Sequence, residues 1–109
     1  MTGTGNMTVQ FGGTLNGQGT VALSGDWNNG GAFNHQNGLV QFDLNGGQNL
    51  TSGSDSFFDL QKSAGGSLLQ QDALDVSNGI TIDLGCTVAT GGFDLTGGAT
   101  LTNLSLIHI

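Results

Sequence analysis

The sequence predicts an all-β fold, a β-solenoid of about four to five coils with no significant helix. Three observations predict it. Apolar and polar residues alternate in short runs, glycine-containing turns separate these runs, and short phrases recur along the chain. FDLNGG at residues 42–47 returns as FDLTGG at 93–98, and TVQF at 8–11 is echoed by LVQF at 39–42.

The alternation has the period of a β-strand with one buried face. Ile80, Ile82 and Leu84 are apolar, whereas Thr81 and Asp83 between them are polar. Successive side chains of a strand point to opposite faces, so this spacing predicts an inward row and an outward row. The chain has 21 glycines and no proline, and it is rich in Asn, Ser and Thr, which are poor helix formers. We therefore expect strands and almost no helix.

Turn signals separate the runs at short intervals. Residues that tolerate positive φ come in pairs between the apolar segments. These pairs are Gly12-Gly13, Asn16-Gly17, Asn37-Gly38, Gly46-Gly47, Ser52-Gly53, Asn78-Gly79, Gly91-Gly92 and Gly97-Gly98. An antiparallel sandwich would also fit many short strands. Its strands are usually longer, about 5–6 residues, and it has no need of internal repeats, so the solenoid is favoured.

A trial register assigns three strands to each coil. The first coil takes residues 39–42, 48–50 and 57–60; the second takes 67–69, 74–76 and 80–82; the third takes 86–88, 93–95 and 99–102. The residues before 38 supply one or two more coils. In this register the Phe and Leu of the recurring phrase point inward, its Asp faces solvent, and its glycine pair turns the chain.

Composition limits the classes of partner. The 109 residues suffice for one domain, and only 8% of them are charged, with a formal net charge of -7. All the acids are Asp, and Lys62 is the lone strong base. Such a charge balance argues against nucleic acid and against an anionic membrane. The sequence has no apolar stretch of transmembrane length and no secretion signal, and its single cysteine, Cys86, excludes an internal disulfide.

Residues 25–50, GDWNNGGAFNHQNGLVQFDLNGGQNL, resemble the repeat units of bacterial surface and secreted β-solenoid proteins. These are the autotransporter passengers and the filamentous-haemagglutinin-like adhesins, and the resemblance extends over roughly residues 6–102. It implies a right-handed single-stranded parallel β-helix, export from the cell, and a role as a stalk or an adhesive surface.

Three acids share one place in the recurring phrase, namely Asp43, Asp59 and Asp94. Stacked carboxylates could bind Ca²⁺. Their spacings of 16 and 35 residues fit no single coil length, and the glycine-rich calcium nonapeptide is absent, so we expect solvated acids and no metal site. Trp27 could stack on a sugar if it were exposed, but core or coil-edge packing is the favoured interpretation. His35 is interpreted as a turn residue, because no Cys or second His stands at metal-binding spacing.

The remaining candidates do not form a catalytic set. Cys86 keeps the inward phase of the strand before it, unless Gly85 breaks that phase, so we expect a buried inert thiol. Asn6 and Asn49 begin short glycosylation patterns, which are common by chance. A polysaccharide lyase would need more cations than Lys62 alone. A hydrolase would need paired carboxylates, and Asp72 and Asp75 have an odd spacing that would put them on opposite faces of a strand.

The last six residues, 104–109, do not continue the repeat chemistry. LSLIHI matches the translation of CTG TCT CTT ATA CAC ATC, a string that resembles the transposon end used to tag DNA for sequencing. We therefore interpret 1–103 as a solenoid segment of a longer array and 104–109 as a translated adapter. The competing interpretation is a genuine final strand.

The sequence predicts a non-enzymatic structural or adhesive rod from an exported bacterial cell-surface protein. We expect no catalytic residues, no cofactor and no metal, and no ligand-binding residues are identified. Glycans or surfaces of a host or the environment are the expected partners, together with neighbouring coils of the same protein. The alternative is a carbohydrate-binding or carbohydrate-processing β-helix whose site lies outside this chain.

Overall fold

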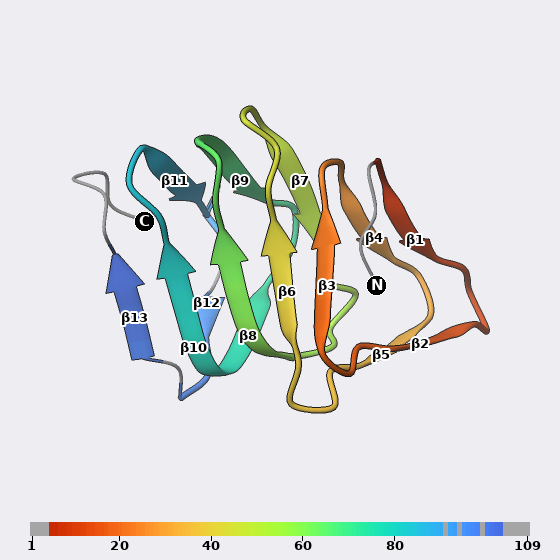
Figure 1. Ribbon diagram of the computed structural model, residues 1–109. Coiled ribbons are helices and arrows are strands. Elements are labelled where there is room, and N and C mark those ends of the chain that lie inside the picture. Colours follow the sequence, from red (N-terminus) through yellow and green to blue (C-terminus); the bar gives the residue numbers. More distant parts are fainter. Residues whose placement is uncertain (1–4, 91, 94, 99, 104–109) are drawn as a thin grey trace.

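The computed structural model describes residues 5–103 except 91, 94 and 99, and within these residues the chain contains strands and no helix (Figure 1). The strands are β1 (Met7–Val9), β2 (Thr14–Asn16), β3 (Thr20–Leu23), β4 (Trp27–Asn29), β5 (Ala32–Asn34), β6 (Leu39–Phe42), β7 (Gln48–Thr51), β8 (Phe57–Lys62), β9 (Gly66–Gln70), β10 (Leu74–Ile82), β11 (Cys86–Ala89), β12 (Leu95–Thr96) and β13 (Thr100–Asn103). The predicted 104–109 adapter segment lies outside the described residues.

The strands stack into parallel sheets around a common core. Sheet I has the order β1-β4-β7-β9-β11, and sheet II has the order β3-β6-β8-β10, with β13 paired to the end of β10. A third side, the lower face, is formed by the β2–β5 pair, by β12 against the start of β10, and by residues 52–56. Every strand pair among the described residues is parallel, as a solenoid requires.

The coil is right-handed. In Figure 1 the chain advances from right to left, rises along sheet II at the front and descends along sheet I behind it. Residues that pair between successive coils are commonly 20 positions apart, as in Met7 with Trp27, Leu39 with Asp59 and Gln48 with Leu68. Sheet I stacks five strands, so about four turns separate the first strand from the last. The predicted all-β solenoid is confirmed.

Of the three coils predicted from the sequence, the first was grouped wrongly. Residues 39–42 form β6, and β8 at 57–62 pairs directly with β6 and so belongs to the next coil. One coil therefore runs β4-β5-β6, and the next runs β7-β8. The groupings of 67–69, 74–76 and 80–82, and of 86–88, 93–95 and 99–102, agree with β9-β10 and with β11-β12-β13. Short strands of similar composition do not say where one coil ends, because that choice depends on hydrogen bonds between distant segments.

Alternation along sheet II builds the core in columns. Val21, Val40, Leu60 and Ile80 occupy one inward column and are almost fully buried. Leu23, Phe42, Lys62 and Ile82 occupy the next inward column and are likewise buried. Removing this much apolar surface from water is the main stabilising contribution of the fold.

Leu84 departs from the predicted inward phase and is 77% exposed. The strand ends at Ile82, and residues 83–85 form a corner in which the Cys86 amide donates to the Asp83 carbonyl at 3.0 Å. Gly85 in this corner has φ +84°. The turn resets the phase, and Cys86 returns to the interior as predicted.

The recurring phrase does not mark one structural position. Phe42 is buried at the end of β6, but Leu44 is exposed in the following corner. Phe58 is half-buried in β8, and Phe93 is 45% exposed. The prediction that Phe and Leu of each copy point inward is therefore wrong. A three-residue phrase does not set its own phase, because pairing with the neighbouring coil decides which side chains face the core.

Candidate functional site

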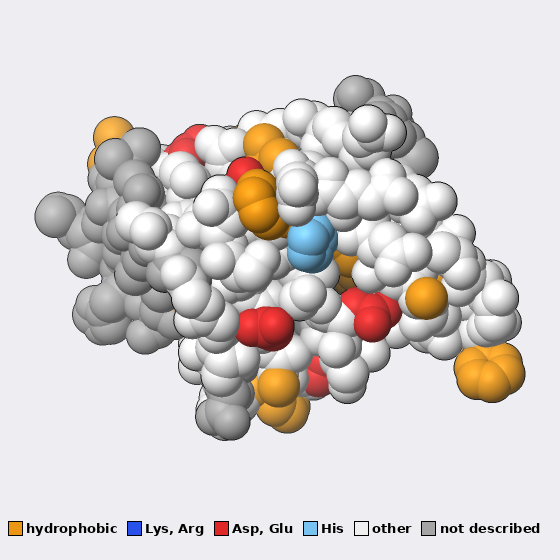
Figure 2. Space-filling model, turned by 90° about the horizontal axis from the view of Figure 1, so that it is seen from below, with side chains coloured by type: hydrophobic (Ala, Val, Ile, Leu, Met, Phe, Trp, Pro, Cys, Tyr) orange, Lys and Arg blue, Asp and Glu red, His pale blue; other side chains and the backbone are white. Residues whose placement is uncertain are grey.

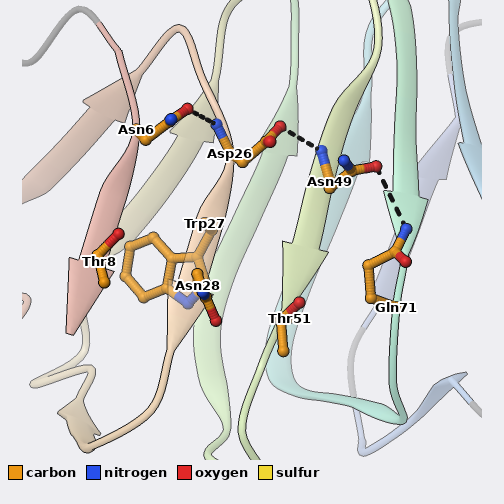
Figure 3. Close-up of a pocket in the computed structure, with 8 residues that line it drawn as sticks. All are labelled: Asn6, Thr8, Asp26, Trp27, Asn28, Asn49, Thr51 and Gln71. Atoms are coloured by element: carbon orange, nitrogen blue, oxygen red, sulfur yellow. Dashed lines mark hydrogen bonds between the residues drawn. The ribbon is translucent and has the colours of Figure 1, made fainter. Parts of the chain in front are cut away.

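Two hollows open on the outer surface of the described residues. The first, the sheet groove, lies on sheet I and has a volume of about 320 Å³. Its lining residues are Asn6, Thr8, Asp26, Trp27, Asn28, Asn49, Thr51 and Gln71 (Figure 3). The second, the lower-face pocket, has a volume of about 430 Å³ and is lined by Phe33, Asn34, His35, Gln36, Ser54, Asp55, Ser56 and Asp75. Both volumes fall within the range of about 300–1,000 Å³ that is usual for small-ligand sites.

The polar groups of the sheet groove bind mainly to one another. Asn6 Oδ1 accepts from the Asp26 amide at 2.8 Å, and Asp26 Oδ1 accepts from the Asn49 amide at 2.8 Å. Asn49 Oδ1 accepts from Gln71 Nε2 at 3.2 Å (Figure 3). The row thus runs across sheet I from β1 through β4 and β7 to β9. This row ties successive coils together and engages the side chains of Asn6, Asp26, Asn49 and Gln71.

The first wall of the lower-face pocket comes from a tight turn after β5. His35 Nδ1 accepts from the Asn37 amide at 3.0 Å, and the His35 carbonyl accepts from the Gly38 amide at 2.9 Å. Gln36 and Asn37 both have positive φ, 49° and 58°. The turn holds the imidazole over the pocket, where it also lies against Phe58 with ring centroids 5.5 Å apart. His35 is thus the turn residue that the sequence predicts, and it also lines the pocket.

The second wall is residues 54–56, which are held by Asp55. Asp55 Oδ2 accepts from Asn29 Nδ2 and from the Phe33 amide, each at 2.8 Å. The Asp55 amide in turn donates to the Ser52 carbonyl at 3.4 Å. The bonds from Asn29 and Phe33 fix one carboxylate oxygen of Asp55 against the preceding coil. The other oxygen, Oδ1, has no hydrogen-bond donor among the described residues.

An aromatic cluster lies beneath the pocket. Phe33, which is 5% exposed, packs edge-to-face on Trp27 with centroids 4.8 Å apart and also contacts Phe57 at 5.3 Å. This packing places an aromatic cluster of the core directly behind the pocket. Figure 2 shows the pocket side of the molecule, with the histidine between acidic side chains.

Asp75 supplies a second carboxylate from the start of β10. It is exposed, and its one hydrogen bond among the described residues is a long one of 3.5 Å from Thr96 Oγ1. The side chains of Gln36, Ser54 and Ser56 make no hydrogen bond within the described part of the chain. The pocket therefore combines the partly exposed His35 ring with several polar groups that make no hydrogen bond within the described residues.

The other predicted candidates are placed elsewhere. Trp27 is 1% exposed in the core, as the favoured interpretation predicted, and its Nε1 has no acceptor within the described residues. Asp43 accepts from Ser24 Oγ at 2.6 Å, whereas Asp59 accepts from Asn78 Nδ2 at 2.7 Å. Asp59 pairs with Leu39 and so does not stack with Asp43, and Asp94 lies outside the described residues.

Asp72 and Asp75 do not form a carboxylate pair in one strand. Asp72 lies in the bend before β10, where Oδ1 accepts from the Ser52 amide at 2.8 Å and Oδ2 accepts from the Gly53 amide at 2.9 Å. Only Asp75 of the two lines the lower-face pocket. Within the residues that the structure describes, no group of three or more His, Cys or Asp side chains is close enough to hold a metal ion.

The sequence interpretation did not predict that Lys62 is buried in the core. It is fully buried, and its Nζ donates to the carbonyls of Leu44, Ser63 and Gly65 at 2.6, 3.1 and 2.7 Å and to Gln48 Oε1 at 3.1 Å. Burial lowers the pKa of Lys62, and the nearby Cys86 and Asp43 raise it in part. One signal was present: Leu60-Gln61-Lys62 continues the alternation, so the lysine takes the inward phase.

Comparison of the chain with family models, with curated proteins and with solved structures finds no match. No helix in the described part of the chain is long and apolar enough to cross a membrane.

Proposed function

We propose that this chain is a structural or adhesive rod segment of an exported bacterial cell-surface protein and that it has no catalytic activity. The supporting observation is that side-chain ladders join successive coils along both outer faces. On sheet I the ladder is the row from Asn6 to Gln71. On sheet II, Gln61 Nε2 donates to both oxygens of Asp83 at 3.0 and 3.1 Å, and Gln41 Nε2 donates to Ser63 Oγ at 3.3 Å.

These ladders favour a rod that presents polar surface. Side-chain amides stacked at the spacing of parallel strands bond from coil to coil, so they stiffen the stack along its axis. The coils contact one another through the buried columns, while most of the Asn, Gln, Thr, Ser and Asp side chains of the described residues are at least partly exposed. Such a surface stays hydrated and still offers many donors and acceptors to glycans or other polar surfaces.

Surface display tests this proposal. The chain is displayed on a non-adherent bacterium, and the retention of cells on glycan-coated and uncoated surfaces is measured under flow. The matched control is Ile82→Asp displayed at the same level, since a carboxylate in a fully buried position unfolds the coil. We expect higher retention for the native chain. Equal retention of the two would refute adhesion, and release of sugar ends from any polysaccharide would refute the absence of catalysis.

A further inference from the structure

We infer that the lower-face pocket binds a sugar that carries a positively charged amino group, as in the glucosamine units of a glycan. This inference rests on the proposed function for its biological setting, and it names the ligand class that the adhesive surface takes. Binding itself is a property of the purified chain, so it is tested independently of adhesion.

The negative charge of the pocket determines the sign of the charge that its ligand carries. Lys62 is the sole strong base of the chain, and it is fully buried, so Asp side chains are the strongly charged groups on the described surface. Asp55 and Asp75 both line the lower-face pocket, and no Lys or Arg lies there to neutralise them. A ligand with an ammonium group would be attracted over a distance of about one Debye length and would pair with these carboxylates at contact.

The hydrogen-bond groups that remain available match a polyhydroxylated ligand. Asp55 Oδ1 has no donor within the described residues, and Asp75 has only the 3.5 Å bond from Thr96. Gln36, Ser54 and Ser56 supply further donors and acceptors that the described part of the chain does not use. Several convergent groups of this kind fix the orientation of a small ligand in a concave site.

The aromatic groups supply the apolar part of the site. His35 is the partly exposed aromatic group of the pocket, held by its turn and by contact with Phe58, and the buried Phe33 lines the pocket from the core side. One face of a pyranose ring exposes C–H groups and packs on such surfaces, which also exclude water from neighbouring polar contacts. A bare ammonium ion or a metal cation would use the carboxylates but would leave the exposed part of the His35 ring uncovered.

The sheet groove is a weaker candidate for the same ligand. It has one carboxylate, Asp26, which accepts from the Asn49 backbone amide, and the Asn49 and Gln71 side chains bind to each other. The Trp27 ring faces the core and is 1% exposed, so it offers no platform to a sugar. The lower-face pocket alone joins two carboxylates, unused polar groups and aromatic surface.

The test is a titration of the purified chain with three β-1,4-linked oligosaccharides of equal length, followed by calorimetry or by chemical-shift changes. The three are built from glucosamine, N-acetylglucosamine and glucose, and they differ only at carbon 2. We expect the glucosamine oligomer to bind about ten-fold more tightly than the other two, with affinity falling as salt is added. Absence of binding by the glucosamine oligomer, or equal affinity for all three, overturns the inference.

Two substitutions with the same change in net charge localise the binding. Asp75→Asn lies in the pocket and removes one of its carboxylates, so it should weaken binding of the glucosamine oligomer about five-fold. Asp59→Asn lies on the outer face of sheet II and should leave the affinity unchanged. Equal weakening by the two would indicate diffuse attraction and would overturn the inference. Asp75 is exposed and weakly bonded, so its variant should have an unfolding midpoint no lower than that of the native chain.

The same variants separate this inference from the proposed function. If displayed Asp75→Asn cells still adhere to surfaces free of amino sugars, and the purified native chain does not bind the glucosamine oligomer, the pocket assignment fails while the rod proposal stands. If the oligomer binds and display confers no retention, the adhesive role fails while the site stands.

Discussion

Lys62 shows how one side chain can resolve a local problem of the fold. The corner at residues 43–47 has five residues, whereas the corner at 63–65 has three. In the longer corner the Leu44 carbonyl accepts a hydrogen bond from the buried Lys62 Nζ at 2.6 Å. Lys62 lies in the column of Phe42 and Ile82. Its ammonium donates hydrogen bonds to that carbonyl, to the carbonyls of Ser63 and Gly65, and to the Gln48 amide oxygen. An unpaired buried carbonyl would cost about 1–3 kcal/mol, so the lysine offsets several such losses.

Lys62→Met should therefore lower stability although it places an apolar residue in an apolar column. The substitution leaves the carbonyls of Leu44, Ser63 and Gly65 without their donor, and we expect a loss of about 2–4 kcal/mol. The outward neighbour Gln61→Met is the matched control and should change stability by about 0.5–1 kcal/mol. Denaturant midpoints compare the two. A Lys62→Met midpoint at or above that of Gln61→Met would contradict this role.

The same lysine should give the protein an alkaline pH dependence. Burial lowers its pKa below the ordinary value of 10.5. Between the folded and unfolded pKa values the unfolded chain binds the proton more strongly, so stability should rise with pH up to about 10.5. The free energy of unfolding is measured against pH for the native chain and for Lys62→Met. Both retain Cys86 and Asp43, so their difference isolates Lys62. A difference that falls with rising pH would contradict the lowered pKa.

At the scale of the element, the corner decides the phase of each strand. Ile82 and Leu84 belong to one alternating run in the sequence, yet Ile82 is fully buried and Leu84 is 77% exposed. Ile82→Ala should cost about 2–5 kcal/mol because it removes apolar surface and leaves a cavity. Leu84→Ala should cost less than about 0.5 kcal/mol. Thermal or denaturant unfolding of the pair measures the contrast, and similar costs would mean that the strand continues through Asp83.

Gly66 lies at a corner where two coils approach each other closely. Its φ is +75°, and a Cβ there would overlap the carbonyl oxygen of Gly46 in the coil beside it. Gly85 has a similar φ of +84° but has no atom within 4 Å of such a Cβ. Gly85→Ala should therefore cost only the strain of the left-handed conformation, about 1–2 kcal/mol. Gly66→Ala should cost clearly more or prevent folding. Equal unfolding midpoints would show that the contact with Gly46 is not tight.

At the scale of the whole molecule, the charged side chains on the described surface are nearly all negative. The formal net charge is -7, and the single lysine is buried in the core. Repulsion among the surface carboxylates opposes the compact state and is screened by salt. We expect the thermal midpoint to rise between about 0.01 M and 0.15 M sodium chloride. Asp59→Asn, which removes one surface charge, should raise the midpoint at low salt and reduce the salt effect. A midpoint that falls with salt would show that attractive pairs dominate.

Much of the architecture follows from the sequence alone. Period-two alternation is a local property, so Val40, Phe42, Ile80 and Ile82 reveal their inward phase without any knowledge of the fold. Turn residues are local as well, and the Asn37-Gly38 turn with His35 before it forms as predicted. Internal repetition then favours a stack of coils over a sandwich, and the structure agrees.

Only the tertiary structure decided the coil grouping, the exposure of Leu84, the set of acceptors around the Lys62 ammonium and the lower-face pocket. The reason is that each depends on which distant segments pair. β8 stacks on β6 because of hydrogen bonds between residues 20 apart, and this pairing places Lys62 under the 43–47 corner. The pocket joins residues 33–36, 54–56 and 75 from three different coils. A local pattern specifies how a strand faces and where it turns, but it contains no information on the neighbour against which it will lie.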